Sequence, residues 1–343
     1  MEFKVIKDQD EWNRTIKEFR YDFFHTWDYH KVNCEQFDTP ILFVVKVDSV
    51  SFAIPFLEKT IASSNNKDLI SVYGYPGPLS NSKSQEANEL CMAYLVTFWK
   101  KQGYVSFFSR SNPFCAPKIS SFCRSAGEVV CVDLERSEDD ILSSMRKDHR
   151  RDIRKLLKSS IQLEVIDSPS SIDFSEFMSI YNETMDNLKA SSAYYFRLDF
   201  YRTLFSSDLY KTTLIFATFD GVRIAAGLFI RTGDVGHYYL SGTRIDFYKK
   251  YPMKLILWQA IISLKREGCL TFNLGGGLGG HRDSLFDFKH GFSKQTVRFD
   301  LIFGKLDALR YEELSFENAE SLGLCDDMMD KISYFPFYRY RES

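Results

Sequence analysis

The chain has 343 residues, of which 44% are hydrophobic and 26% charged, so it is long enough for two ordinary domains with substantial cores and excludes long disordered stretches. Its formal net charge of -2 gives no global preference for nucleic acid or an anionic membrane surface. Aromatic residues make up 16% of the chain, which favours mixed sheets and ring-lined pockets over simple helical bundles.

The first half of the chain is predicted to form strands followed by one long helix. Alternating apolar residues predict strands at 41–47, 51–57 and 69–75, the last leading into the turn at Pro76-Gly77-Pro78. A helix over 84–101 ends with two lysines before Gly103, as the helix dipole and a left-handed cap favour. The strand at 104–109 follows.

A strongly basic helix over 145–158 separates the two halves. The polar residues 167–171 then break the chain, and a further helix is predicted from 174 to 188. The charges of this basic segment fit a solvated helix between domains, and they also fit contact with tRNA phosphates or with the diphosphate of an acceptor.

The second half repeats the order of elements in the first. Strands are predicted at 214–219, 223–230 and 236–241, a helix at 252–266 and a strand at 269–274. The order strand, strand, strand, helix, strand therefore occurs twice, which indicates duplicated α/β modules with mixed sheets. Coincidence of common elements is the alternative explanation.

Cysteine spacing and hydropathy indicate the cellular compartment in which the protein is expected to work. The 7 cysteines are scattered without a C-x-x-C pair, so they are expected to be reduced thiols, and neither they nor the 6 histidines show metal-ligand spacing. The first residues contain no apolar signal segment, and the apolar run 255–262 is too short to span a bilayer. We expect a cytoplasmic protein with no metal.

The most informative segment is 271–293, an apolar strand that opens into a glycine loop carrying Asp283 and Lys289. Gly275, Gly277 and Gly280 match the spacing of a dinucleotide-binding turn, but that motif needs a long helix and a parallel sheet downstream, where the chain soon ends. Glycines let a ligand approach bare backbone amides, with an acid and a base within a few residues. This segment is predicted to be the wall of an active site.

Short segments spread over nearly the whole chain carry a family resemblance as a set. They are residues 26–30, 71–78, 110–113, 150–155, 194–196, 237–243 and 274–292. In this order they resemble the Fem-type double acyltransferases, whose tandem modules have the Gcn5-related N-acetyltransferase (GNAT) fold. Within that superfamily the chain looks closest to N-acyltransferases of nucleotide-linked amino sugars from surface-polysaccharide gene clusters, including 3-hydroxybutyryl transferases.

The resemblance implies an α/β fold of two tandem GNAT-like modules. Residues 1–145 would form the acceptor side, 146–170 the basic helical linker, and 171–343 the acyl-donor and catalytic side, with the acceptor in the cleft between modules. It also implies acyl-coenzyme A (acyl-CoA) as co-substrate. The chain departs from the family at residues 245–254, where the glycines of the usual pyrophosphate loop are absent.

The lysines of residues 245–254 still offer a candidate site for a phosphate group. Pro252 is well placed at a helix start, the amides of the first turn point outward, and lysines supply positive charge. A solvated basic turn is the alternative. The predicted cofactor-binding residues are Lys249, Lys250, Tyr251, Met253, Lys254 and, from the following strand, Lys294.

Attack of an amine on a thioester needs a base near pH 7 and a donor for the developing oxyanion. His237 is the titratable candidate on a strand, with simple packing as its alternative role. Asp283 is a candidate base or ammonium ligand, with helix capping as its alternative role. The resemblance assigns Lys289, in a Phe-Lys pair, to the donor or the reacting carbonyl, with a surface salt bridge as the alternative.

Aromatic and small polar residues are the predicted acceptor site. Tyr73, Tyr75 and Gly77 resemble the acceptor-binding wall, where rings stack on a nucleobase and phenols bond a sugar or phosphate. The other predicted substrate-binding residues are Tyr195, Tyr239, Asn273, Gly276 and Ser284.

The leading hypothesis is transfer of an acyl group, acetyl or 3-hydroxybutyryl, from acyl-CoA to the amine of a dTDP-linked aminodideoxy sugar for O-antigen or capsule synthesis. One alternative is a Fem-type peptidyltransferase that uses aminoacyl-tRNA and a peptidoglycan precursor, although the coiled-coil arm common in those ligases is not visible. Another is a non-catalytic binding protein that retains the fold.

Overall fold

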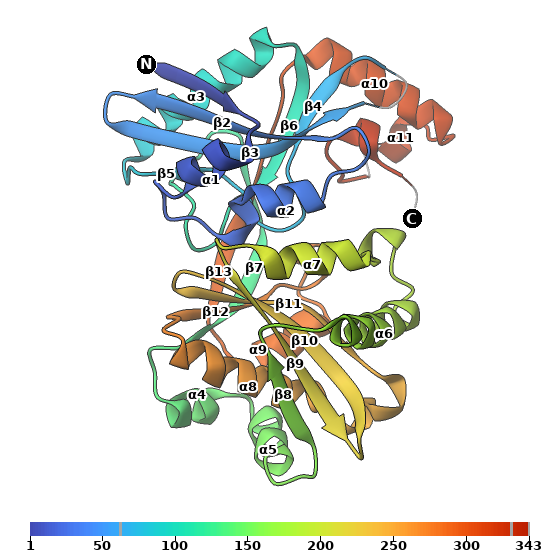
Figure 1. Ribbon diagram of the computed structural model, residues 1–343. Helices are drawn as coiled ribbons and strands as arrows, with labels where there is room; N and C mark the ends of the chain where they lie inside the picture. The colour runs from blue at the N-terminus through green and yellow to red at the C-terminus, as the bar shows by residue number, and fades with distance from the viewer. Residues whose placement is uncertain (62–63, 330–331, 342–343) are drawn as a thin grey trace. The chain divides into compact units, whose positions relative to one another are not determined.

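The computed structural model describes residues 1–61, 64–329 and 332–341 (Figure 1). The chain divides into two compact units: unit 1 is residues 1–126 with 299–343, and unit 2 is residues 127–298. This division differs from the expected boundaries at 145/146 and 170/171. The last part of the chain returns to unit 1, because β13 (Thr296–Lys305) pairs with β6 (Tyr104–Arg110) through Leu301–Lys305.

Unit 1 is built on a mixed sheet. Its order is β1 (Glu2–Ile6), β2 (Thr39–Val47), β3 (Val50–Thr60), β4 (Lys67–Ile70), β6 and the end of β13, with β5 (Leu79–Ser80) paired to β3. All neighbours are antiparallel except β4 and β6. The predicted strand 69–75 is shorter in the structure, where β4 ends at Ile70, and Gly74 then turns the chain with a φ of 104°.

The helix α3 (Gln85–Lys101) supplies the core of unit 1. Trp99 is fully buried, and its ring lies 5.4 Å from the ring of Phe43, 5.5 Å from Phe56 and 5.1 Å from Phe107. Aromatic pairs at these separations stabilise beyond their buried area. The other helices of unit 1 are α1 (Gln9–Ile16), η1 (Phe23–His25), α2 (Trp27–Val32), α10 (Ala308–Ser321), α11 (Asp326–Met329) and η5 (Phe337–Arg339).

Two histidines are fully buried in unit 1. His25 and His30 have no exposed surface, and burial lowers the pKa of His25 to about 4 and that of His30 to about 3. Nδ1 of His30 lies 3.0 Å from the carbonyl oxygen of Thr26, so this nitrogen carries the hydrogen of the neutral ring. Both residues therefore stay neutral in the folded chain at pH 5.

Between pH 7 and 5, His30 alone is expected to lower the free energy of unfolding by about 2 kcal/mol, because the unfolded histidine takes up a proton and the folded one does not. The His30→Asn variant keeps a donor for Thr26 but does not titrate. Urea unfolding followed by tryptophan fluorescence should show a weaker pH dependence for this variant than for the wild type. The exposed His281→Asn change is the control, and an equal slope in all three proteins would contradict the prediction.

The strands of unit 2 are also of mixed direction. Their order is β7 (Cys123–Asp133), β12 (Thr271–Gly275), β11 (Val235–Thr243), β10 (Val222–Thr232), β9 (Lys211–Phe219) and β8 (Gln162–Ile166). Only β11 and β12 are parallel. The other elements are α4 (Glu138–Ser144), α5 (Lys147–Leu156), α6 (Ser171–Asn187), η2 (Ser192–Tyr194), α7 (Leu198–Ser206), η3 (Ile245–Lys250), α8 (Pro252–Arg266), η4 (Leu278–Gly280) and α9 (Ser284–His290).

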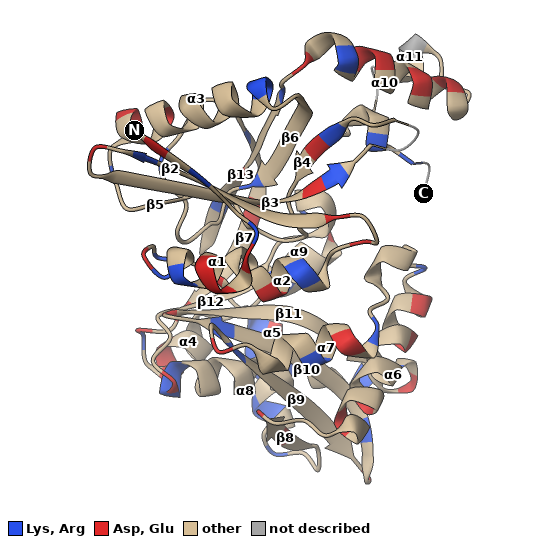
Figure 2. Cartoon of the chain, turned by 45° about the horizontal axis from the view of Figure 1, so that its top comes forward, with Lys and Arg blue, Asp and Glu red and all other residues tan. Residues whose placement is uncertain are grey.

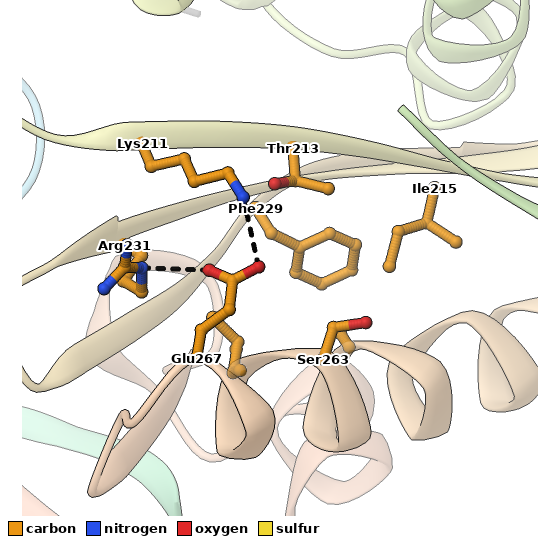
Figure 3. A pocket seen from close by; sticks show the side chains of 9 residues that line it. Lys211, Thr213, Ile215, Phe229, Arg231, Ser263 and Glu267 are labelled. Atoms are coloured by element: carbon orange, nitrogen blue, oxygen red, sulfur yellow. Dashed lines mark hydrogen bonds and ion pairs between the residues drawn. The ribbon is translucent and has the colours of Figure 1, made fainter. Parts of the chain in front are cut away.

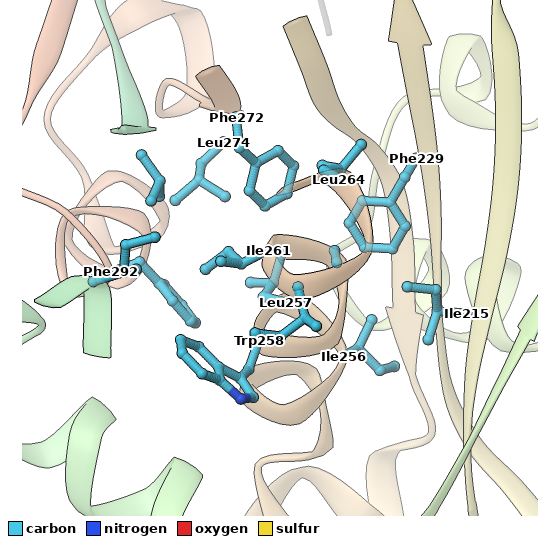
Figure 4. Close-up of a cluster of buried hydrophobic side chains, with 14 of the residues drawn as sticks. Ile215, Phe229, Ile256, Leu257, Trp258, Ile261, Leu264, Phe272, Leu274 and Phe292 are labelled. Atoms are coloured by element: carbon cyan, nitrogen blue, oxygen red, sulfur yellow. The ribbon is translucent and has the colours of Figure 1, made fainter. Parts of the chain in front are cut away.

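The helix α8 forms the centre of the core of unit 2. It begins at Pro252 and ends at Arg266, the predicted bounds. In Figure 4 its side chains Leu257, Ile261 and Leu264 lie among residues of the sheet and of the chain after α9, including Phe229, Phe272 and Phe292. At about 25 cal/mol per Å² of apolar surface, this burial is the main stabilising contribution to unit 2.

The predicted repeat of elements is present in the structure. In unit 1, α3 connects β4 to its parallel neighbour β6, and in unit 2, α8 connects β11 to its parallel neighbour β12. Antiparallel strands precede the helix in both units, because β2, β3 and β4 correspond in order to β9, β10 and β11. Lys and Arg residues are interspersed with Asp and Glu along the elements of both units (Figure 2).

Candidate active site

The strands β11 and β12 part beyond a short parallel contact. Their register runs from Val235 opposite Thr271 to His237 opposite Asn273, and the described pairing ends there. From Tyr238 onward β11 pairs only with β10 in the described register, which is irregular between Leu228 and Phe229. The end of β12 therefore leads away from β11 into the glycine loop. On the side where β12 leaves, the backbone of β11 from Tyr238 onward therefore has no partner strand in the described register.

His237 and Asn273 lie at the point where the strands part. Both are buried, and Nδ2 of Asn273 lies 3.2 Å from Nδ1 of His237, while Oδ1 of Asn273 accepts a hydrogen bond of 2.8 Å from the amide of Gly275. Since Nδ2 donates, Nδ1 accepts, and this assigns the ring hydrogen to Nε2. His237 in this tautomer is a donor at Nε2, which does not favour its predicted role as a base at that atom.

Lys289 points its ammonium group at the glycine loop. Its Nζ donates a 2.6 Å hydrogen bond to the carbonyl oxygen of Gly276, and a Cβ at Gly275, where φ is +78°, would lie 3.1 Å from Nζ. The side chain is only 8% exposed, and burial lowers its pKa to about 8, against the opposing charge of Asp283. A cation held in such surroundings is a strong electrostatic group for chemistry at the loop.

Asp283 holds the two ends of the loop together. Its side chain caps α9 by accepting a 2.8 Å hydrogen bond from the amide of Phe286, and it accepts a second of 2.9 Å from the amide of Leu278. These backbone hydrogen bonds lower its pKa. The contacts favour the capping role over that of a base near neutral pH.

We call Tyr238, Asn273, Gly275, Gly276 and Lys289 the glycine-loop site. Nζ of Lys289 lies 6.0 Å from the centre of the Tyr238 ring, whose stacking on Phe229 at 5.7 Å fixes its plane. The Tyr238 hydroxyl hydrogen-bonds Oγ of Ser241, and burial raises its pKa to about 12, so it stays protonated at neutral pH. Tyr238 was missed by the sequence reasoning, although it adjoins His237.

The predicted cofactor-binding residues fall into different environments. Lys249 and Lys250 are exposed on η3, and Nζ of Lys250 lies 3.9 Å from the centre of the Phe219 ring. Lys254 is buried and forms an ion pair of 2.7 Å with Asp152, so its charge is already neutralised. Tyr251 caps α8 in a left-handed conformation, Met253 packs against the core, and Lys294 lies 3.3 Å from Nδ1 of His290.

The predicted acceptor residues are divided between the units. Tyr73 and Gly77 belong to unit 1 with Tyr75, which is half-buried and whose ring packs edge-on at 5.6 Å from Phe24 and at 5.0 Å from Phe299. In unit 2, the Tyr195 hydroxyl donates to Asp186 at 2.7 Å, and Tyr239 stacks 6.5 Å from Phe200. Asn273 and Gly276 lie in the glycine-loop site, and Ser284 is the first residue of α9.

A separate hollow in unit 2 lies between α8, β9 and β10 (Figure 3). Glu267 bridges its two cations, at 3.2 Å from Lys211 and 3.0 Å from Arg231. These charges satisfy one another, and the hollow shares no residue with the glycine-loop site. Among the described residues, no group of His, Cys, Asp and Glu side chains could hold a metal ion, and no described helix is long and apolar enough to cross a membrane.

Comparison with known proteins identifies the fold. Residues 143–289 match the family described as "Acetyltransferase (GNAT) domain", whereas no curated protein matches the sequence. A crystal structure of FemX is similar over 88% of this chain and 97% of its own, with 11% identity and a TM-score of 0.65. A tandem GNAT protein from the clavulanic acid biosynthesis pathway is similar over 88% and 99%, with 9% identity and a TM-score of 0.50.

A third similar structure is the C-terminal domain of a putative lysylphosphatidylglycerol synthetase from Agrobacterium fabrum. It is similar over 86% of this chain and 92% of its own, with 14% identity and a TM-score of 0.53. These similarities confirm the predicted α/β fold of two tandem GNAT-like modules. The domain match, which covers the glycine-loop site, identifies the protein as an acyltransferase.

Proposed function

We propose that the protein transfers an acyl group, acetyl or 3-hydroxybutyryl, from acyl-CoA to the amino group of a dTDP-linked aminodideoxy sugar. The observation that carries acyl transfer is the glycine-loop site, where buried Lys289 donates to the carbonyl oxygen of Gly276 just beyond the parting strands β11 and β12. We place the reaction in the cytoplasm, on the route to O-antigen or capsule. The sugar acceptor rests on the family resemblance, since fold alone does not select a substrate.

The acceptor amine attacks the thioester carbonyl itself, without an acyl-enzyme, and the reaction passes through a tetrahedral intermediate. The neutral amine of the acceptor forms the new C–N bond, the carbonyl oxygen takes up negative charge, and the C–S bond breaks as this intermediate collapses. The proton lost by the amine balances the charge of the departing thiolate. In this proposal the ammonium group of Lys289, which donates to the carbonyl oxygen of Gly276, stabilises the oxyanion. Tyr238 and Asn273 line the same site.

The start of α8 fits the diphosphate of coenzyme A. No side chain caps the helix at Tyr251, so the positive end of the helix dipole is uncapped there, although Pro252 has no N–H and the amide of Lys254 donates to the carbonyl of Tyr251. Lys249 and Lys250 are exposed just before it and can follow a mobile phosphate. Lys254 is not part of this proposal, because it is buried and paired with Asp152. Coenzyme A supplies the activated thioester when bound.

The test is a thiol-release assay of the purified protein with acyl-CoA, alone and with a dTDP-linked 3-amino-3,6-dideoxyhexose. Thiol release that requires the amino sugar is the expected result. A rise in melting temperature with acyl-CoA alone would show donor binding independently of turnover. Donor binding without sugar-dependent release would overturn the proposed acceptor.

The second candidate is a Fem-type transferase that uses aminoacyl-tRNA, and the similarity to FemX over 88% of the chain favours it. Such an enzyme would gain no stability from acyl-CoA and would transfer an amino acid to a peptidoglycan precursor. Absence of both stabilisation and thiol release, with transfer of a radiolabelled aminoacyl group, would favour this candidate over the sugar acyltransferase.

A further inference from the structure

The basic helix α5 does not stand free between the modules. Its apolar residues Ile153 and Leu156 are buried in the core of unit 2, and His149 on the same helix is also buried. Lys254 of α8 pairs with Asp152 at 2.7 Å and lies 3.6 Å from Asp148. The acidic residues of α5 are therefore used to hold α8. Asp148 also pairs with Arg146 at 2.6 Å and lies 3.1 Å from Nδ1 of His149, so the three residues form a cluster at the N-terminal end of α5.

Arg146 and His149 contact the C-terminal turn of α9, the helix that carries Lys289. Nε2 of His149 lies 3.0 Å from the carbonyl oxygen of Phe288, and Nη1 of Arg146 donates to that of Asp287 at 3.2 Å. The amide of Arg146 donates to the carbonyl oxygen of Gly291 at 2.8 Å. Carbonyls at a helix C-terminus carry partial negative charge. Those of Asp287 and Phe288 accept from the amide of Gly291, and the donors of Arg146 and His149 add further hydrogen bonds to them.

The imidazole of His149 fits its place closely. Its ring packs edge-on against Phe292 at 4.7 Å, and a Cβ added at Gly291 would lie 2.5 Å from two of its ring atoms. Burial and the charge of Lys254 lower its pKa, so the neutral ring is favoured. Nε2 donates to the carbonyl oxygen of Phe288 at 3.0 Å, while Nδ1 lies 3.1 Å from Oδ2 of Asp148 and 3.4 Å from Nη2 of Arg146.

We propose that Arg146 and His149 are positioning residues: through the carbonyls of Asp287, Phe288 and Gly291 they fix the last turn of α9 and so hold Nζ of Lys289 on the glycine loop. This inference rests on the proposed acyl transfer, in which Lys289 acts. It gives the basic segment a role inside unit 2. A displacement of about 1 Å of a catalytic group is enough to lower a rate by up to about 100-fold.

Two replacements of His149 separate positioning from packing. His149→Phe keeps an aromatic ring of similar size but has no donor for Phe288, whereas His149→Gln keeps an N–H near the place of Nε2. We expect kcat for acyl transfer to fall about 10- to 100-fold in His149→Phe, with the KM for acyl-CoA unchanged, and to recover in His149→Gln. Arg154→Ala, an exposed charge on the same helix, is the matched control.

A measurement without substrate keeps this inference separate from the proposed function. Competitive acetylation of Lys289 as a function of pH, read by mass spectrometry of its peptide, gives the pKa of that amine in the resting protein. We expect a value near 8 in the wild type and Arg154→Ala, and a higher value in His149→Phe, where water reaches the loosened turn.

An unchanged titration of Lys289 in His149→Phe would overturn the positioning role, whatever the kinetics show. Equal loss of kcat and melting temperature in His149→Phe and His149→Gln would also overturn it, because packing alone would then explain the effect. An altered titration of Lys289 in a protein with no sugar-dependent thiol release would support the positioning role of Arg146 and His149 and contradict only the proposed function.

Discussion

Replacing Lys289 with methionine is expected to lower kcat for acyl transfer about 100- to 1,000-fold, the usual cost of removing one donor to an oxyanion. Methionine fills nearly the same buried space without the ammonium group. Since Nζ of Lys289 is the cation that faces the glycine loop at Gly276, the loss should fall on kcat more than on the KM for acyl-CoA. Initial rates of thiol release with saturating donor measure both constants.

The same substitution is expected to leave the fold intact or to stabilise it. Burial disfavours the charged lysine in the folded chain, which is why its pKa is lowered to about 8. The unfolded lysine keeps its ordinary pKa, so wild-type stability should rise as pH increases from about 8 to 10.5, where only the unfolded state still binds the proton. Lys289→Met removes this rise. A large loss of melting temperature at pH 7 would instead assign Lys289 a structural role.

The pH profile distinguishes the two chemical roles of Lys289. If the ammonium stabilises the oxyanion, kcat/KM falls as pH rises through about 8, the pKa of Lys289 in the free protein. A neutral amine acting as base would give a rise over the same interval. We expect the fall. The exposed Lys294→Met change, which lies on the segment after α9, should leave the descending limb in place.

Elements with strong local signals were predicted well from the sequence. The bounds of α8 follow from Pro252 at its first turn and from the basic pair before Gly268, and the hairpin after β9 follows from Asp220-Gly221, which both have positive φ. The order of strands around α3 and α8 was also correct, because it depends on local pattern alone. The family resemblance supplied the GNAT fold and drew attention to Lys289.

Features that depend on long-range contacts were not predicted. The return of β13 to unit 1 depends on pairing with β6, almost 200 residues earlier in the chain, and no local pattern marks it. The sequence predicted that Lys254 binds phosphate. Its ion pair with Asp152 joins two helices that are far apart in the sequence, and no local pattern indicates it. The donors of Arg146 and His149 to α9 were hidden in a segment whose composition predicts a solvated helix. Because basic residues dominate this segment, the sequence did not indicate the ion pair of Asp152 or the burial of Ile153 and Leu156.

The residues near the C-terminus are held to unit 1 by a buried carboxylate. Asp68 on β4 has no exposed surface, and Arg339 donates to it at 2.6 and 2.7 Å, while the Tyr338 hydroxyl donates at 2.9 Å. Tyr338 also bonds Ser106 at 2.7 Å. Burial raises the pKa of Asp68 more than Arg339 lowers it, so the pair as a whole pays a large desolvation cost.

Replacing Asp68 with asparagine is therefore expected to lower the free energy of unfolding of unit 1 by about 3 to 5 kcal/mol, because it leaves the guanidinium of Arg339 without its counter-charge. The double variant Asp68→Leu with Arg339→Met should recover most of this loss, since two apolar side chains need no compensation. Glu312→Ala, which breaks an exposed pair with Lys305, should cost less than about 1 kcal/mol. Urea unfolding followed through Trp12 and Trp99, both buried in unit 1, measures all three. Equal losses in the single and double Asp68 variants would mean that the charges themselves, and not the unpaired arginine, determine how this segment is held.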